Sequence, residues 1–386
     1  MNLLSKKTET ADINNQSFNV GSFRTAQYNL INYFMNLCIE YISKQNKNYL
    51  TVHKINIYDI TTYVSINNNF MTHVSVDVNV NGPTGVETKT FLKFLIPTLI
   101  NETFFVLSGN YYVPTIYILD KPIVIKDKSI KLTSTFNSIT IYDKLITFMG
   151  TNIPAIYFLN LFLLDSDPAQ AATKNEFVQT FKINQIQITD QDLLNYFSNL
   201  FKCDPKRDEI QKRFTNIFFD DYSKLLYQHC YNLTESDLTF PNLLRIAIDL
   251  EKNMLDDTFI DLNQKRLLFI EILLWPIFKR IANVATQASK GYTVSEITMD
   301  QMELVKNFYT KLHNKFIYDN VNAYDTMLSH KACMLNPNAK NAPGVVANLH
   351  PTHFQRICPT SVSSQNPGET ICIVAEAKLD LFGRFL

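Results

Sequence analysis

The stretch HVSVDVNV at residues 73–80 alternates polar and apolar side chains without a break, and the turn residues NGPTG follow it at 81–85. Successive side chains of a β-strand point to opposite faces of a sheet, so this alternation predicts a half-buried strand. The alternation resumes over 86–96, which predicts a hairpin. The first part of the chain, to about residue 145, is therefore expected to be mixed but mostly β, with further strands at 104–108, 112–119, 122–126 and 129–141.

Helical periodicity appears on both sides of this β-rich part. Apolar residues recur at helical spacing over 23–44, which predicts an amphipathic helix. From about residue 150 the pattern is helical, apart from a polar break at 165–175, and beyond about residue 325 it becomes rich in loops. The expected fold class is α+β. The expected helices span 153–164, 189–202, 207–231, 240–255, 263–287 and 297–318.

The bulk composition limits the classes of protein that fit. With 386 residues and 46% hydrophobic content, the chain can hold about two or three domain-sized cores. Its net charge is zero, so contact with nucleic acid would depend on local patches or on a more basic assembly. The longest apolar runs are about twelve residues, shorter than the ~20 of a membrane-spanning helix. We see no secretion signal, and the six cysteines form no CxxC pair, which is typical of thiols in a reducing cytosol.

The motifs that usually identify an enzyme are missing. The sequence contains no glycine-rich phosphate loop, no GxSxG and no HExxH. Aspartate pairs occur, but none forms a DxDxD cluster that could hold two metal ions ~4 Å apart. Thr189 precedes the pair Asp190 and Asp192 at an expected helix start, so helix capping is the preferred interpretation, and the same holds for Asp256 and Asp257.

A metal site is one alternative for the C-terminal region. His350, His353 and Cys358 could supply ligands, but Pro351 prevents a regular helix there and no fourth ligand is close in sequence. A rigid polar turn that positions side chains is the preferred interpretation.

The most suggestive feature is electrostatic, because residues 329–358 contain no acidic residue. Such a loop suits contact with phosphates, which Lys, Arg and backbone N–H groups bind. An ordinary solvated loop explains the composition equally well, and composition alone leaves both interpretations open. The basic side chains of this segment are His330, Lys331, Lys340, His350, His353 and Arg356.

A resemblance favours the first interpretation. The segment NLHPTHFQRICP at 348–359 resembles the signature DVHPTHYGRVCP of the β subunit of multisubunit DNA-directed RNA polymerases. LSHKACML at 328–335 is similar to the family's LTHKRRLSAL. GETICIVAEAKLDLFGRF at 368–385 is similar to a segment that follows the signature, so the three fall in the family's order. Both arginines of the family's HKRR are lost here, at Ala332 and Cys333, which puts contacts through those positions in doubt.

Weaker similarities extend the resemblance to roughly residues 90–386. IDLNQKRLLFIEILLWPIFKR at 260–280 resembles another motif of the family and carries Asn263, Lys265 and Arg266 in its polar cluster. The family continues well beyond the position of Leu386. A β subunit divided at this point resembles the split subunits of giant-bacteriophage polymerases.

The resemblance implies a domain order and a function. It implies a polar tail at 1–20, a protrusion-like mixed α/β part at 21–149, a reduced lobe-like helical region at 150–250, a helical return to the protrusion at 251–324 and a fork region at 325–386. The chain would be the N-terminal half of a split β-type subunit that positions template DNA and RNA near the active centre. A viral nucleic-acid-binding or structural protein without a polymerase role is the alternative, and the family order of the motifs argues against it.

The resemblance also implies partners and site residues. No catalytic residue or cofactor is expected in this chain, because magnesium would be bound by a β′-type partner. The expected partners are a C-terminal β-type chain, β′-type chains, DNA, RNA and a promoter-specificity factor, in the host cytoplasm or the virion and not at a membrane. The residues expected near nucleic acid, or shaping the fork, are Lys265, Arg266, His330, Lys331, Lys340, His350, His353 and Arg356.

The C-terminal segment carries one more expectation. The apolar run at 371–374 predicts a buried strand. The apolar residues after it need burial that little remaining chain could supply, so we expect a partner chain to cover them. These residues are Leu379, Leu381, Phe382, Phe385 and Leu386.

Overall fold

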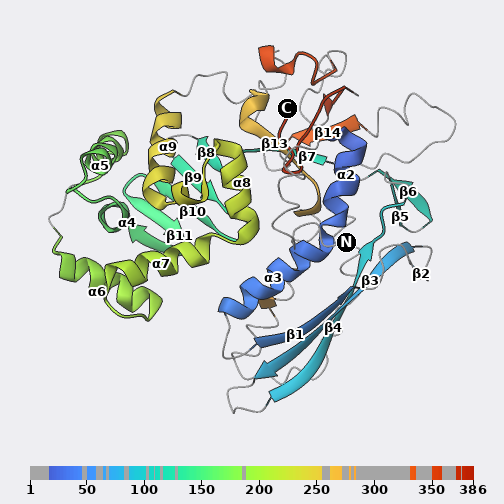
Figure 1. Cartoon of the computed structure of the whole chain (residues 1–386), viewed down its shortest axis with the longest axis horizontal. Helices are drawn as coiled ribbons and strands as arrows, with labels where there is room; N and C mark the ends of the chain where they lie inside the picture. Colours follow the sequence, from blue (N-terminus) through green and yellow to red (C-terminus); the bar gives the residue numbers. More distant parts are fainter. Residues whose placement is uncertain are drawn as a thin grey trace. The chain divides into compact units, whose positions relative to one another are not determined.

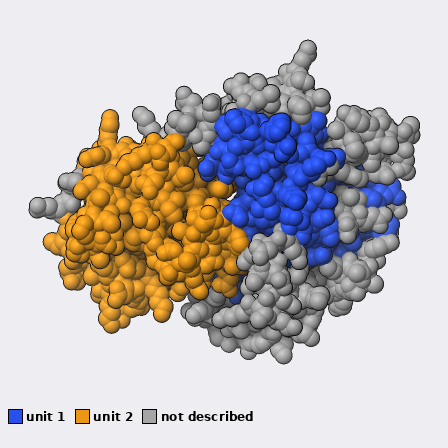
Figure 2. Space-filling model, turned by 45° about the horizontal axis from the view of Figure 1, so that its top comes forward, with its two compact units in different colours: residues 1–119, 260–386 blue, residues 120–259 orange. Residues whose placement is uncertain are grey.

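The chain forms two compact units, one from residues 1–119 with 260–386 and the other from 120–259 (Figure 2). Both contain helices and sheets, which confirms the α+β class. None of the described helices is long and apolar enough to cross a membrane. The structure is a computed structural model and describes residues 17–45, 50–57, 64–66, 69–81, 87–100, 104–107, 109–113, 116–126, 129–184, 188–253, 261–271, 278–279, 282–283, 331–335, 350–358, 371–374 and 376–386.

The discontinuous unit begins with two helices, α2 (Val20–Asn29) and α3 (Ile31–Gln45) (Figure 1). The sequence predicted a single helix over 23–44, but the backbone leaves the helical conformation at Leu30. The side chain of Asn19 caps α2 by accepting a hydrogen bond from the backbone N–H of Ser22 at 2.9 Å. Six residues of the apolar stripe expected from the sequence are buried, namely Phe23, Leu30, Ile31, Phe34, Leu37 and Cys38.

A twisted antiparallel sheet follows, built around the long strand β3 (Asn69–Asn81). Strand β4 (Glu87–Pro97) pairs with β3 along its whole length, from Asn81↔Glu87 to Met71↔Pro97, which confirms the predicted hairpin. Two further strands pair with β3, namely β1 (Leu50–Ile57) and β2 (Val64–Ile66). A short hairpin, β5 (Phe105–Leu107) with β6 (Asn110–Tyr112), comes next.

A second sheet of this unit joins segments that are far apart in the sequence. Its strand order is β13-β7-β14-β15. Strand β7 (Ile116–Asp120) pairs in parallel with β14 (Ala332–Leu335), and β14 pairs antiparallel with β15 (Ile371–Cys372). The expected helix over 263–287 is wrong at its start, because β13 (Lys265–Leu268) is a strand. The expected helix over 297–318 lies outside the described residues.

The continuous unit, 120–259, is an antiparallel sheet packed against helices (Figure 1). Its five strands lie in the order β12-β11-β10-β9-β8, so each pairs with its neighbour in sequence. They are β8 (Ile123–Lys126), β9 (Ser129–Thr133), β10 (Ser138–Tyr142), β11 (Leu145–Phe148) and β12 (Thr151–Pro154). The helices are α4 (Ala155–Phe162), α5 (Pro168–Thr180), α6 (Asp190–Phe201), α7 (Arg207–Phe218), α8 (Asp221–Tyr231) and α9 (Phe240–Lys252).

The boundaries of this unit differ from those expected. The helical region was placed at 150–250, whereas the compact unit starts at residue 120, because the helices bury their apolar faces on strands β8–β12. The strand expected over 129–141 is two strands, with a turn in which Ser134 N donates to Asn137 O at 2.8 Å. The polar break expected at 165–175 contains the start of α5, and the helix expected over 207–231 is divided between α7 and α8.

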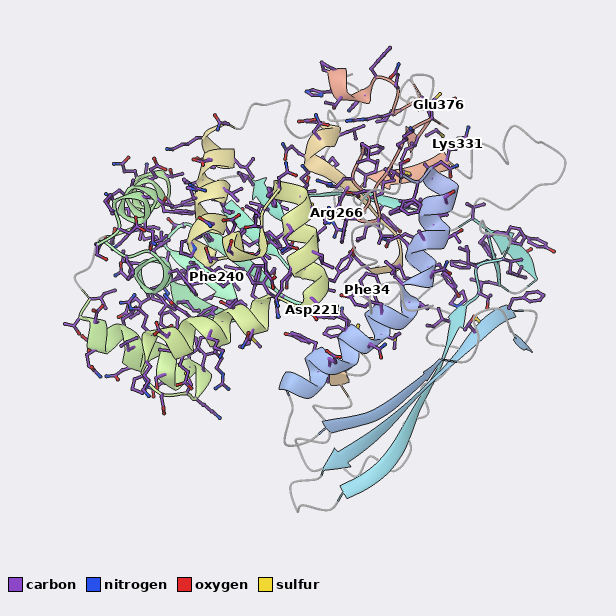
Figure 3. The ribbon with its side chains drawn as sticks, viewed as in Figure 1. Phe34, Asp221, Phe240, Arg266, Lys331 and Glu376 are labelled. Atoms are coloured by element: carbon purple, nitrogen blue, oxygen red, sulfur yellow. The ribbon has the colours of Figure 1, made fainter. Side chains whose placement is uncertain are left out.

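The core of the continuous unit is aromatic, with Phe214 of α7 at its centre. The ring of Phe214 stacks on Phe148 with centroids 4.8 Å apart and meets Phe158 and Phe162 edge-on at 5.5 Å. Phe240 of α9 joins the same cluster (Figure 3). Each fully buried side chain of this size contributes ~1.5–3 kcal/mol, so this core accounts for much of the unit's stability.

The aspartate pairs of this unit cap helices. Thr189 Oγ1 accepts from Asp192 N at 3.2 Å at the start of α6, which confirms the predicted capping. Asp167 caps α5, and Asp220 caps α8 by accepting from Ser223 N at 2.9 Å. Burial raises the pKa of the Asp220 carboxyl above its ordinary value, although hydrogen bonds from Ser223, from Thr135 and from its own backbone oppose the shift. Asp256 and Asp257 lie outside the described residues.

Candidate nucleic-acid interface

Four segments that carry the sequence motifs form one hydrogen-bonded layer in the discontinuous unit. Residues 356–358 lie beside 371–374, because Cys358 N donates to Cys372 O at 2.8 Å and Val374 N donates to Arg356 O at 3.0 Å. Ile373 N donates to the carbonyl oxygen of Lys331 at 2.9 Å. On the far side of β7, β13 completes the sheet. The predicted buried strand at 371–374 thus has neighbours on both edges.

The HPTH sequence forms a tight turn. A single 3₁₀ turn spans Pro351–His353, and His353 N donates to His350 O at 2.9 Å. Nδ1 of His350 lies 2.8 Å from the hydroxyl of Thr352, which also accepts a hydrogen bond from Leu262 N at 3.0 Å. The His353 ring is buried, and its Nδ1 accepts from the backbone N–H of His350 at 3.5 Å. Both histidines therefore shape the turn.

Arg356 joins this turn to the segment before β13. Its Nη1 donates to Oδ1 of Asn263 at 2.8 Å, and its guanidinium carbon lies 5.7 Å from the centroid of the Phe385 ring. Among the described residues, no acidic side chain forms an ion pair with Arg356. The positive charge is therefore held in place by an amide and an aromatic ring, both neutral.

The two predicted site residues on β13, Lys265 and Arg266, have surroundings that differ from those of Arg356. Arg266 forms a two-pronged ion pair with Glu271, with Nη2–Oε2 at 3.1 Å and Nη1–Oε1 at 3.3 Å. The two side chains are only 11% and 15% exposed, so Glu271 neutralises this arginine inside the fold. Lys265 is half-buried. The pattern of charges favours Arg356 over Arg266 as a phosphate ligand.

The remaining predicted residues are placed only in part. Lys331 immediately precedes β14 and is half-buried (Figure 3). His330 and Lys340 lie outside the described residues. Within the part of the chain that is described, no three His, Cys, Asp or Glu side chains are grouped as a metal site would require. His350 and His353 are brought close, with ring centroids 6.1 Å apart.

The C-terminal tail packs inside its own unit. Leu379 forms a β-bridge with Phe18, and Leu267 N donates to Gly383 O at 2.6 Å. The expectation that a partner chain must cover the tail is wrong for four of its apolar residues, because this chain buries them; Leu386, by contrast, is 57% exposed. The four buried residues are Leu379, Leu381, Phe382 and Phe385.

Sequence reasoning missed Phe385 and Thr352 as parts of the site. Phe385 comes from the end of the chain and Thr352 from the middle of the HPTH motif, and each contacts a segment distant in sequence. Apolar residues near a chain end carry no signal for such a contact.

The chain was compared with family models and with curated proteins. It matches no family model and no curated protein. The family membership implied by the motifs is accordingly a proposal.

Proposed function

We propose that this chain is the N-terminal half of a split β-type subunit of a multisubunit DNA-directed RNA polymerase. In this proposal it positions template DNA and RNA near the active centre, and β′-type partner chains bind the magnesium and perform nucleotidyl transfer. The proposal is supported by the described parts of four motif segments, which meet around one small sheet: 261–271, 331–335, 350–358 and 371–374 with 376–385. Segments that bind the same nucleic acid have to be adjacent in space, and the described parts of these segments are adjacent.

The observation that carries the proposal is the environment of Arg356. The guanidinium is held by Asn263 and Phe385, and neither partner carries a negative charge that would offset its positive charge. Arg binds phosphate through a planar fork of donors, and one Nη–H engaged by an amide leaves other donors for such a ligand. A structural salt bridge would be the alternative role for Arg356, and no acidic side chain of the described residues forms one with it.

Other residues of the layer support Arg356 and would not themselves bind phosphate. The buried ion pair Arg266–Glu271 and the histidine-capped turn make a rigid support. A rigid support lowers the entropy lost when a ligand is bound, since the contacting group is already in position. Partners in this proposal are a C-terminal β-type chain, β′-type chains, the nucleic acids and a promoter-specificity factor.

Replacing Arg356 tests the proposal. Arg356→Gln keeps an N–H donor for Asn263 but removes the charge, so the fold should hold while phosphate binding weakens. We expect the assembled polymerase to contain this variant in normal amount, to elongate poorly, and to show a salt dependence reduced by about one phosphate contact. Arg213→Ala is the control, because Arg213 is an exposed arginine of α7 in the other unit. Elongation by Arg356→Gln equal to that of the wild type at every salt concentration would exclude this role.

A further inference from the structure

One aromatic side chain beside Arg356 is turned outward. Phe354 is 78% exposed, more than any other large apolar side chain among the described residues. The phenylalanines of the aromatic core around Phe214 are by contrast almost completely buried. An isolated exposed apolar residue is common on protein surfaces and by itself indicates nothing. The backbone around Phe354 is what distinguishes it.

The turn that carries Phe354 is fixed on both sides. Phe354 N donates to Pro351 O at 3.2 Å, and the N–H groups of Arg356 and Ile357 both donate to His353 O, at 3.0 and 2.9 Å. Gln355 has a φ of +60°, which is a left-handed backbone conformation. This conformation is unfavourable for every residue except glycine, so it persists only where the surrounding structure imposes it. The ring is thus presented by a rigid turn.

The charges around the turn point to the kind of ligand. Residues 350–358 contain no acidic side chain, and Arg356 follows Phe354 at the second position with only neutral partners. Proteins that bind single-stranded nucleic acid combine such a cation for the backbone with an exposed aromatic ring on which a base stacks. Both groups come here from one turn.

We propose that Phe354 stacks on an unpaired nucleobase while Arg356 binds a neighbouring phosphate. This inference rests on the proposed function and specifies its ligand as a strand that is single or frayed at a junction. In an intact duplex the neighbouring bases cover both faces of each base, so the Phe354 ring has no exposed base on which to stack. DNA and RNA present the same chemistry to a ring, and the experiment separates them.

The test uses the full-length chain and synthetic oligonucleotides with a central 2-aminopurine, whose fluorescence falls when the base stacks. The probes are a single-stranded DNA, an RNA of the same sequence, and the corresponding duplex. Phe354→Leu keeps an apolar side chain without a ring, and Phe354→Trp keeps a ring. We expect quenching with the wild type and with Phe354→Trp, and about tenfold weaker single-strand binding by Phe354→Leu, with duplex binding unchanged. The strand, DNA or RNA, that shows the larger loss is the natural ligand.

Other outcomes overturn the inference in distinguishable ways. If Phe354→Leu binds single strands as tightly as the wild type while Arg356→Gln binds them more weakly, the stacking role fails and the proposed function stands. If neither variant differs from the wild type, or the wild type binds no probe, both fail. If Phe354→Leu changes only the recovery of partner chains, the ring contacts protein and the stacking role is again wrong. Because Phe354 is exposed, unchanged thermal unfolding of the variants is expected and excludes a folding defect.

Discussion

Gly383 allows the C-terminal tail to lie directly against β13. Its φ is +78°, and a Cβ atom there would lie 2.1 Å from the carbonyl oxygen of Leu267, so nothing larger than glycine fits. We predict that Gly383→Ala destabilises the contact by at least about 2 kcal/mol, from the left-handed backbone and the collision together. Hydrogen exchange of the amides at 265–268 should then be about 30-fold faster.

Gly150 provides the matched control. It has a φ of +74°, but a Cβ there meets nothing within 4 Å. Gly150→Ala should therefore lower the local stability only by the ~1–2 kcal/mol of the left-handed backbone conformation. Amide hydrogen exchange in the β11–β12 turn measures this loss. Equal effects of the two substitutions, each measured at its own site, would mean that the tail does not pack on β13 as described.

The charge pattern of the sequence identifies a candidate site residue such as Arg356. The sequence does not reveal which acidic residue forms an ion pair with an arginine such as Arg266. The acid-free segment identified Arg356, which the structure leaves without an acidic partner among the described residues. Arg266 was grouped with it through the resemblance of 260–280 to a family motif, and the helix expected over 263–287 gave no sign of its pairing with Glu271. Residues five apart lie about 140° apart around a helix and do not meet. With Arg266 on strand β13 and Glu271 in the helical residues 270–271, they do.

At the scale of elements, hydrophobic periodicity predicted secondary structure correctly where the alternation of polar and apolar residues continued over many positions. The alternation over 73–80 and 86–96 predicted the β3–β4 hairpin. The strands β11 and β12 have four residues each and were missed, although β8, of the same length, falls on the strand expected at 122–126. Helix α5 was missed because only Thr173 and Phe177 of its residues are buried, so its sequence has no apolar stripe.

The pairing of 356–358 with 371–374 can be tested by cross-linking. The bridge Ile357↔Ile373 puts Cys358 and Cys372 directly opposite each other at a hydrogen-bonded position. Such positions have Cα atoms about 5.5 Å apart, within the range of a disulfide. We predict that diamide, which accepts two electrons and two protons from the thiols, links Cys358 to Cys372. Peptide mass spectrometry should find this bond and none in Cys372→Ser. A bond from Cys358 to Cys203 instead would show that the pairing is wrong.

At the scale of the whole molecule, the two units differ in what the sequence could reveal. The strands of 120–259 pair with their neighbours in sequence, so local patterns contain most of that unit's information. In the discontinuous unit β7 pairs with β14, more than 200 residues away along the chain. No local pattern encodes such a contact, and the motif resemblance did not predict it either, because it placed β7 in the protrusion-like part and β14 in the fork region.

The continuous unit should fold alone. All residues of its main core cluster come from within 120–259. We predict that a fragment of these residues unfolds cooperatively in urea, with a free energy in the ~5–15 kcal/mol range of ordinary domains. Circular dichroism against urea concentration measures this. A gradual, non-cooperative loss of helix signal would show that the unit needs the rest of the chain.

The burial of the tail also changes how assembly should be studied. Truncation after Ser361 removes β15 and the residues that cover β13, so it would unfold the discontinuous unit whether or not a partner binds there. Loss of a partner in such a truncation would therefore be uninformative. Assembly has to be measured with the chain intact.

We propose that this chain is one part of an RNA polymerase and that it does not make RNA alone. The most direct measurement is to purify the intact, tagged chain with the proteins that bind it and to assay RNA synthesis on a DNA template. We expect a complex that contains a C-terminal β-type chain and β′-type chains and that makes RNA, and we expect no RNA synthesis by the isolated chain. A chain recovered as a monomer without such partners, or able to polymerise nucleotides alone, would contradict it.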